Sequence, residues 1–238
     1  MQVLKITLEG VTTSFRYPLF MLGVQPTFEM PPPATIYGHI CSALGDWIDP
    51  RGVEFAYHFT FDRKLMDLEH VHVLGPSSGK LPGTTFPKVL EGNINPFQRE
   101  ILFQPRLTLY INKPEWAGAF QSPRYVVTLG RSQDLCAYTN VRVMALEPRQ
   151  NAYFEHTLIP FEHPFKPPQG VVLQMPRFLE YANKRRPAFG RYVMLKQRVM
   201  SDDERMLSFG APPESFWVDP ESPEVNGRQL GLIFHSFV

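Results

Sequence analysis

Cysteine, unbalanced charge and long apolar runs are scarce in this 238-residue sequence, and each scarcity excludes a class of protein. The two cysteines, Cys41 and Cys136, lie in apolar surroundings without CxxC or Cys/His ligand spacing, so we expect buried thiols in a reducing cytoplasm and no bound metal. No apolar run approaches the ~20 residues that span a bilayer, and Met1 begins a strand-like segment. We therefore expect a cytoplasmic protein with no signal peptide and no membrane partner.

Charge is balanced over the whole chain but not along it. With 24 Lys and Arg against 23 Asp and Glu, the chain lacks the basic excess typical of nucleic-acid-binding proteins. From Arg177 to Arg198 there are seven basic residues and one acid, whereas from Ser201 to Glu224 seven acids accompany Arg205 alone. The first segment predicts a phosphate-binding stripe and the second a surface for a basic partner, with two solvated surface segments as the alternative.

What the chain does contain is 24 prolines and 19 phenylalanines, together with clear apolar periodicity. Apolar residues alternate in the segments 4–8 and 53–61, which predicts strands, and they recur at helical spacing from Ile36 to Trp47, with Gly45 placed to end the helix. A third strand is predicted at 107–111, extending back toward Ile101 with Pro105 at a bulge or an edge position. A short helix near 114–120 and a fourth strand at 125–129 complete the order βαββαβ, which is an α+β fold of the ferredoxin-like kind.

Two regions exceed this unit. The connection over about 62–100 is far longer than a hairpin turn, and connections of this length in compact domains are usually functional or disordered. After residue 146, strand-like pieces alternate with proline-rich loops, which predicts a smaller β-rich region over 147–238 beside a first domain over 1–146. His70 and His72 lie on one side of a possible strand, but no nearby Cys or carboxylate pattern completes a metal site.

Three motifs, taken together and in order, identify a family resemblance. They are Ser14-Phe15-Arg16-Tyr17-Pro18-Leu19-Phe20, the segment 31–46 with the sequence PPPATIYGHICSALGD, and the segment 122–132 with the sequence SPRYVVTLGRS. They resemble the subunit that binds the 5′ handle of the crRNA in type I CRISPR Cascade, a member of the RAMP superfamily, and most closely its type I-B branch. The resemblance covers residues 1–146 well and the last third only loosely.

The resemblance implies a modified ferredoxin-like (RAMP) domain in which 62–100 is a thumb hairpin. It also implies a non-catalytic, cofactor-free subunit that caps the crRNA 5′ handle, contacts the backbone and large subunits, and meets target DNA only through the complex. The residues expected to contact RNA are Phe15, Arg16, Tyr17, Thr35, Tyr37, Gly38, Lys88, Arg99, Arg106, Arg124, Gly130, Arg131 and Ser132.

The chemistry of these residues suits the role, and each also has a simpler interpretation. Thr35 near a helix start lies where backbone N–H groups attract phosphate, although it can merely cap the helix. Gly38 permits close approach of another chain or merely packs. Arg131 can bind a phosphate or a guanine edge, or form a surface ion pair. Phe15 and Tyr17 can stack on bases or anchor their loop.

Two other functions stay open at this stage. A metal-independent endoribonuclease that processes precursor crRNA needs a general acid and a general base, for which Tyr37, His39 and His58 are the candidates. Tyr37 and His39 are two residues apart on a helix and point to different faces, so they cannot both face one phosphate. A scaffold that contacts only proteins is the other alternative.

Overall fold

An antiparallel sheet of five strands forms the centre of the computed structural model, which describes residues 1–18, 20, 23–165, 167, 169–203 and 214–238. The strands lie in the order β10-β1-β9-β6-β19. Their bounds are β1 Gln2–Gly10, β6 Glu54–Thr60, β9 Arg106–Ile111, β10 Cys136–Ala145 and β19 His235–Ser236. The helices that connect them are α1 Pro33–Leu44, the 3-10 turn η1 Pro114–Trp116 and α2 Ala117–Gln121. Leaving β19 aside, the strand order is that of a ferredoxin-like unit, which confirms the predicted α+β fold.

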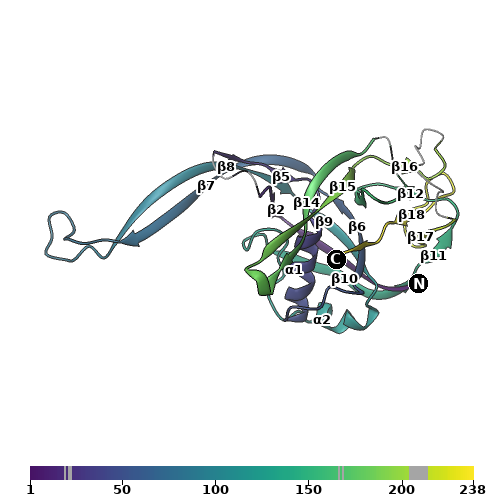
Figure 1. Cartoon of the computed structure of the whole chain (residues 1–238), viewed down its shortest axis with the longest axis horizontal. Helices are drawn as coiled ribbons and strands as arrows, with labels where there is room; N and C mark the ends of the chain where they lie inside the picture. Colours follow the sequence, from purple (N-terminus) through teal and green to yellow (C-terminus); the bar gives the residue numbers. More distant parts are fainter. Residues whose placement is uncertain (19, 21–22, 166, 168, 204–213) are drawn as a thin grey trace.

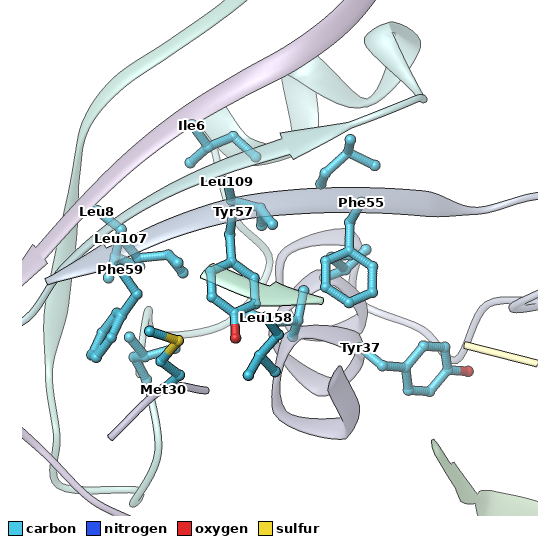
Figure 2. Packing of buried hydrophobic residues seen from close by; sticks show 14 of the residues in the cluster. Ile6, Leu8, Met30, Tyr37, Phe55, Tyr57, Phe59, Leu107, Leu109 and Leu158 are labelled. Atoms are coloured by element: carbon cyan, nitrogen blue, oxygen red, sulfur yellow. The ribbon is translucent and has the colours of Figure 1, made fainter. Parts of the chain in front are cut away.

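One face of this sheet packs on α1. Alternating residues of β6 (Phe55, Tyr57 and Phe59) are buried and point in one direction, toward Met30, Tyr37 and Leu158 (Figure 2). Leu4, Ile6 and Leu8 of β1 belong to the same core. Helix α1 ends where the sequence predicts, because Gly45 adopts a left-handed conformation (φ 89°) and its N–H donates to Cys41 O.

The fourth strand of the unit differs from the prediction. The segment 125–129 forms only an isolated bridge between Thr128 and Leu135, and the strand beside β1 is β10. The backbone of the 125–129 region serves other contacts, because Arg124 N–H donates to Ala43 O and Leu129 N–H donates to Asp134 O. An alternating apolar pattern was therefore not enough to place 125–129 in the sheet.

The predicted third strand is also two strands, in different sheets. Gln104 has a positive φ of 51° and, with Pro105, separates β8 (Leu90–Phe103) from β9. Strand β8 pairs instead with β7 (Arg63–Pro76) in the predicted long hairpin, which extends away from the rest of the molecule (Figure 1). Four short strands lie between β1 and α1: β2 Thr12–Thr13, β3 Phe15–Arg16, β4 Val24–Gln25 and β5 Thr27–Phe28. Of these, β2 and β4 pair with β8 and hold the base of the hairpin.

The last third of the chain forms two small sheets. One has the order β11-β17-β18-β12-β16 and the other β13-β15-β14. Their bounds are β11 Glu147–Arg149, β12 Tyr153–Phe154, β13 Thr157–Pro160, β14 Val171–Glu180, η2 Tyr181–Asn183, β15 Arg186–Leu195, β16 Val199–Met200, β17 Phe216–Asp219 and β18 Leu230–Leu232. The division at residue 146 stays a prediction, and β19, near the end of the chain, pairs with β6 of the first sheet.

The described residues contain no helix long and apolar enough to cross a membrane. Much of the acidic segment, 204–213, lies outside the described residues, as do Leu19 of the first motif and Arg205.

Candidate nucleic-acid interface

A groove of about 470 Å³ brings the three sequence motifs together. It lies between α1 and the β14–β15 hairpin. The motif residues that line it are Phe15, Arg16, Pro18, Pro32, Ala34, Thr35, Gly38, His39, Ser42, Thr128 and Gly130. Segments more than 80 residues apart in the sequence therefore share one surface.

The first motif enters the groove because strand pairing orients it. Strand β3 pairs with β5, and Phe15 N–H donates to Thr27 Oγ1 over 2.7 Å. Phe15 is only 2% exposed and packs edge-to-face on Phe59. The expectation that Phe15 stacks on a base is wrong, because its ring belongs to the core, whereas Arg16, the next residue, is exposed and lines the groove.

Tyr17 is half-buried and stacks on Phe28, with the ring centroids 3.7 Å apart. Burial, aided by Glu29, raises the pKa of its hydroxyl. This contact anchors the loop, which was the alternative to base stacking.

The first turn of α1 has fewer free N–H groups for binding an anion than we expected from Thr35 near the helix start. The helix begins at Pro33 with Pro32 as its N-cap, so two residues of the first turn have no N–H group. The N–H groups of Thr35 and Ile36 both donate to Pro32 O. Thr35 is neither the cap nor the first residue, and of the first turn only Ala34 has an N–H group outside these bonds among the described residues.

Gly38 is the most informative position on the helix. A Cβ atom placed there would meet no described atom within 4 Å, so the glycine is not required for packing inside this chain. Glycine costs roughly 1 kcal/mol relative to alanine in a helix. Gly38 lines the groove, and its lack of a side chain leaves the groove open at this point of the helix.

The third motif contributes a tight turn at Gly130 to the groove, whereas its Arg131 does not line the groove. Gly130 has a positive φ of 97°, and a Cβ there would lie 2.7 Å from Ser14 O, so only glycine lets this turn pack against the first motif. Arg131 forms a two-pronged contact with Asp134, with distances of 2.9 and 2.7 Å, and an ion pair with Glu69. The guanidinium of Arg131 therefore binds two carboxylates, which is the simpler of its two interpretations, and its RNA contact stays a prediction.

Sequence reasoning did not place the β14–β15 hairpin at this site. Phe178 packs edge-to-face on Tyr37, and Tyr181 stacks on Trp47 with ring centroids 4.5 Å apart, so the hairpin is held over α1. It contributes Pro176, Leu179, Arg185, Pro187 and Phe189 to the groove. The only signal for it in the sequence was the basic stretch from Arg177 to Arg198.

The groove is cationic even though the whole chain is nearly neutral. Its charged lining residues, among those the structure describes, are Arg16 and Arg185. Arg185 lies between Lys184 and Arg186 at the tip of the hairpin, where Lys184 and Arg185 both adopt positive φ. A polyanion in the groove would therefore meet arginines from both walls.

The three candidate catalytic residues are not brought together. His39 is buried; its Nδ1–H donates to Thr128 O over 2.9 Å, which leaves Nε2 to accept from the Tyr138 hydroxyl over 2.8 Å. Burial lowers the pKa of His39, so the ring is neutral. The Tyr37 hydroxyl donates to Ile48 O, and His58 lies 3.8 Å from Glu155.

The other predicted contact residues lie outside the groove. Lys88, near the hairpin tip, pairs with Glu91. Arg99 is 8% exposed and pairs with Glu69 at 2.7 Å, so it supports the base of the hairpin. Arg106 pairs loosely with Glu9, Arg124 covers Gly45 at the end of α1, and Ser132 is exposed in the turn after Gly130.

Comparison with known proteins adds evidence on the fold. No family model matches the chain, and no curated protein matches its sequence. A solved structure of a "CRISPR RNA-guided surveillance complex" contains a chain that is 17% identical, with a TM-score of 0.52; the match covers 82% of this chain and 90% of that one. A CRISPR protein from Archaeoglobus fulgidus is 10% identical, with a TM-score of 0.51 and coverage of 99% and 100%.

The chain has the fold of these CRISPR proteins. Identities this low establish a shared architecture, and function has to be argued from the groove itself.

Proposed function

We propose that this chain is a non-catalytic subunit of a CRISPR surveillance complex and that its groove binds the 5′ handle of the crRNA. The observation that carries the proposal is the convergence of all three motifs on one groove whose charged lining residues are arginines. The open surface over Gly38 supports it, because that glycine has no packing role within the described structure. The shared fold is compatible with this role.

The wider arrangement is proposed from the same resemblance. The chain would belong to a type I complex, most closely the I-B branch, with the β7–β8 hairpin against a backbone subunit. A large subunit would lie beside the bound handle, and target DNA would be met only through the complex.

Substituting Gly38 with leucine tests the groove directly. Gly38→Leu places in the groove a side chain whose Cβ meets no described atom within 4 Å, and we expect it to weaken binding of a labelled repeat-derived RNA at least roughly tenfold, about 1.4 kcal/mol. The matched control is Gly118→Leu, because Gly118 is also helical and has no atom within 4 Å of its Cβ position, but does not line the groove. Equal affinity of the two variants, both folded by circular dichroism, would contradict the proposal.

Arg185 tests the electrostatic part. Arg185→Ala should weaken binding and reduce the slope of log K against log salt by about 0.7, the value for one phosphate contact on a single strand. Arg149→Ala is the control, because Arg149 is exposed and paired with Glu147 outside the groove. A salt slope unchanged by Arg185→Ala would argue against a phosphate at this wall.

Incubation of the chain with its repeat RNA in the absence of metal tests the non-catalytic assignment. We expect binding without cleavage, because both ring nitrogens of His39 are engaged and Tyr37 and His58 lie outside the groove lining. A cut that His39→Ala abolishes would support the endoribonuclease alternative instead.

A further inference from the structure

A second polar pocket, of about 490 Å³, adjoins the groove on the same hairpin. Gln174, Arg177, Gly190 and Arg191 of β14 and β15 line it, and the end of the chain contributes His235. Phe189, 39% exposed, lines both the groove and the pocket. A strand leaving the groove past Phe189 would therefore enter this pocket.

A β-bulge determines where Arg177 points. The register of β14 against β15 shifts between Pro176 and Phe178, so Arg177 is the extra residue with no partner across the ladder. Bulges of this kind redirect a side chain and are common beside functional sites. Among the described residues, nothing accepts a hydrogen bond from the buried Nε of Arg177.

His235 has a buried acceptor atom without a donor, whereas Arg177 has a buried donor atom without an acceptor. It is 2% exposed, and its Nε2–H donates to Leu158 O over 2.9 Å, so Nδ1 carries a lone pair. Nδ1 is buried and, within the part of the chain that the structure describes, has no donor beside it. Burial lowers the pKa of His235 to about 4, which keeps the ring neutral and Nδ1 an acceptor. Unmatched buried polar atoms are rare in folded proteins and call for an explanation.

The remaining charges leave the pocket cationic. Arg191 lies over the Phe161 ring, 4.4 Å from its centroid, and forms an exposed ion pair with Glu162 at 3.6 Å. Glu162 is the one acid among the described lining residues, against two arginines. A phosphate can replace the carboxylate beside Arg191, since exposed ion pairs of this type are weak.

We propose that this pocket binds a further nucleotide of the RNA strand whose 5′ end lies in the groove, an inference that rests on the proposed function. The ligand must offer an acceptor to Arg177 and a donor to His235 Nδ1. A nucleotide offers both, through its phosphate oxygens and through a ribose hydroxyl or an exocyclic amine, whereas inorganic phosphate offers chiefly acceptors. Phe189 provides an aromatic face for a base at the junction.

Shortening the RNA tests this inference. Labelled handle RNAs are shortened one nucleotide at a time from the 3′ side, and their affinity for the full chain is measured. Wild type should lose roughly tenfold, about 1.4 kcal/mol, at the length where the strand no longer reaches the pocket. Arg177→Ala should bind long RNAs as weakly as wild type binds short ones and show no such step. Arg177→Lys, which keeps the charge but lacks the Nε–H group, should recover part of the step.

The outcomes separate this inference from the proposed function. If Arg177→Ala, like the control Arg149→Ala, still loses affinity at the same RNA length as wild type, the proposal that the pocket binds a nucleotide is wrong. The proposed function of the groove would not be affected by that result. Gly38→Leu should weaken the binding of RNAs of every length. If it does not, the proposal that the groove binds the RNA is contradicted, whatever Arg177→Ala shows. Thermal melting of each variant excludes loss of folding as the cause.

Discussion

Asp219 is a buried carboxylate that joins two sheets. It is 1% exposed, accepts hydrogen bonds from Lys5 Nζ of β1 over 2.5 Å and from the Tyr110 hydroxyl of β9 over 2.6 Å, and lies on β17. Burial opposes its ionisation, but these hydrogen bonds together outweigh burial and lower its pKa. The carboxylate therefore links the outer face of the central sheet to the small sheet that packs on it.

Asp219→Asn should destabilise the protein by about 1.5–3 kcal/mol at neutral pH, because the largely buried Lys5 would lose the nearer of its two carboxylate partners and keep Glu221 at 3.5 Å. Since the folded pKa of Asp219 is lowered, its contribution is complete above the unfolded pKa of about 3.9 and is lost as pH falls through the lower folded value. Denaturant unfolding below about pH 4 should therefore show a steeper loss in wild type than in the variant.

Asp49→Asn serves as the control for this titration. Asp49 is exposed and pairs with Arg51 only two residues away, so we expect its contribution to folding to be small. Identical acid profiles for wild type and Asp219→Asn would contradict the assigned role.

At the scale of elements, the β7–β8 hairpin combines a braced base with an unsupported outer half. Glu69 pairs with both Arg99 and Arg131 at the base, whereas Val73 and Leu74, farther along β7, are 52% and 65% exposed. Figure 1 shows the outer half extending away from every other element. The outer half therefore contributes little to the stability of this chain.

Replacing residues 73–93 with Asn-Gly should leave the free energy of unfolding within about 1 kcal/mol of wild type. Val73 pairs with Asn93, so the deletion keeps the remaining strands in register, and Asn-Gly favours a tight hairpin turn. Glu69→Gln, at the base of the same hairpin, should instead cost about 2–4 kcal/mol, because it removes a carboxylate from two partly buried arginines. Chemical denaturation should show this difference between the two variants. A large decrease in the free energy of unfolding on shortening would instead show that the outer half stabilises the chain.

For the whole molecule, the end of the chain ties the last third to the first sheet. Phe237 is fully buried, stacks on Phe55 with centroids 4.6 Å apart and packs edge-to-face on Tyr37. β19 extends the central sheet beyond β6. We therefore expect the regions on either side of residue 146 to unfold together.

Phe237→Ala should cost about 3–5 kcal/mol, as for other large buried aromatics. With Trp47 and Trp116 replaced by Phe, the fluorescence of Trp217 reports on β17, whereas far-ultraviolet circular dichroism reports on the chain as a whole. In Phe237→Ala, both signals should change in one coincident transition at a lower denaturant concentration than in wild type. Two-state unfolding gives coincident transitions by different probes. Two separated transitions, with only one shifted by the substitution, would instead support independent domains over 1–146 and 147–238.

Local features of the sequence determined β1, β6, α1 and its end at Gly45, because apolar period and glycine conformation are properties of a few neighbouring residues. The resemblance of the three motifs predicted Arg16, Gly38 and Gly130 as contact residues, and the fold places all three on one groove. Tertiary structure decided that β10 rather than 125–129 pairs with β1, because both segments alternate and strand choice depends on distant backbone partners. It also decided that Arg131 binds carboxylates and that Arg185 closes the groove. A side chain's partner depends on which charges the fold brings near it, which the spacing of residues along the chain does not specify.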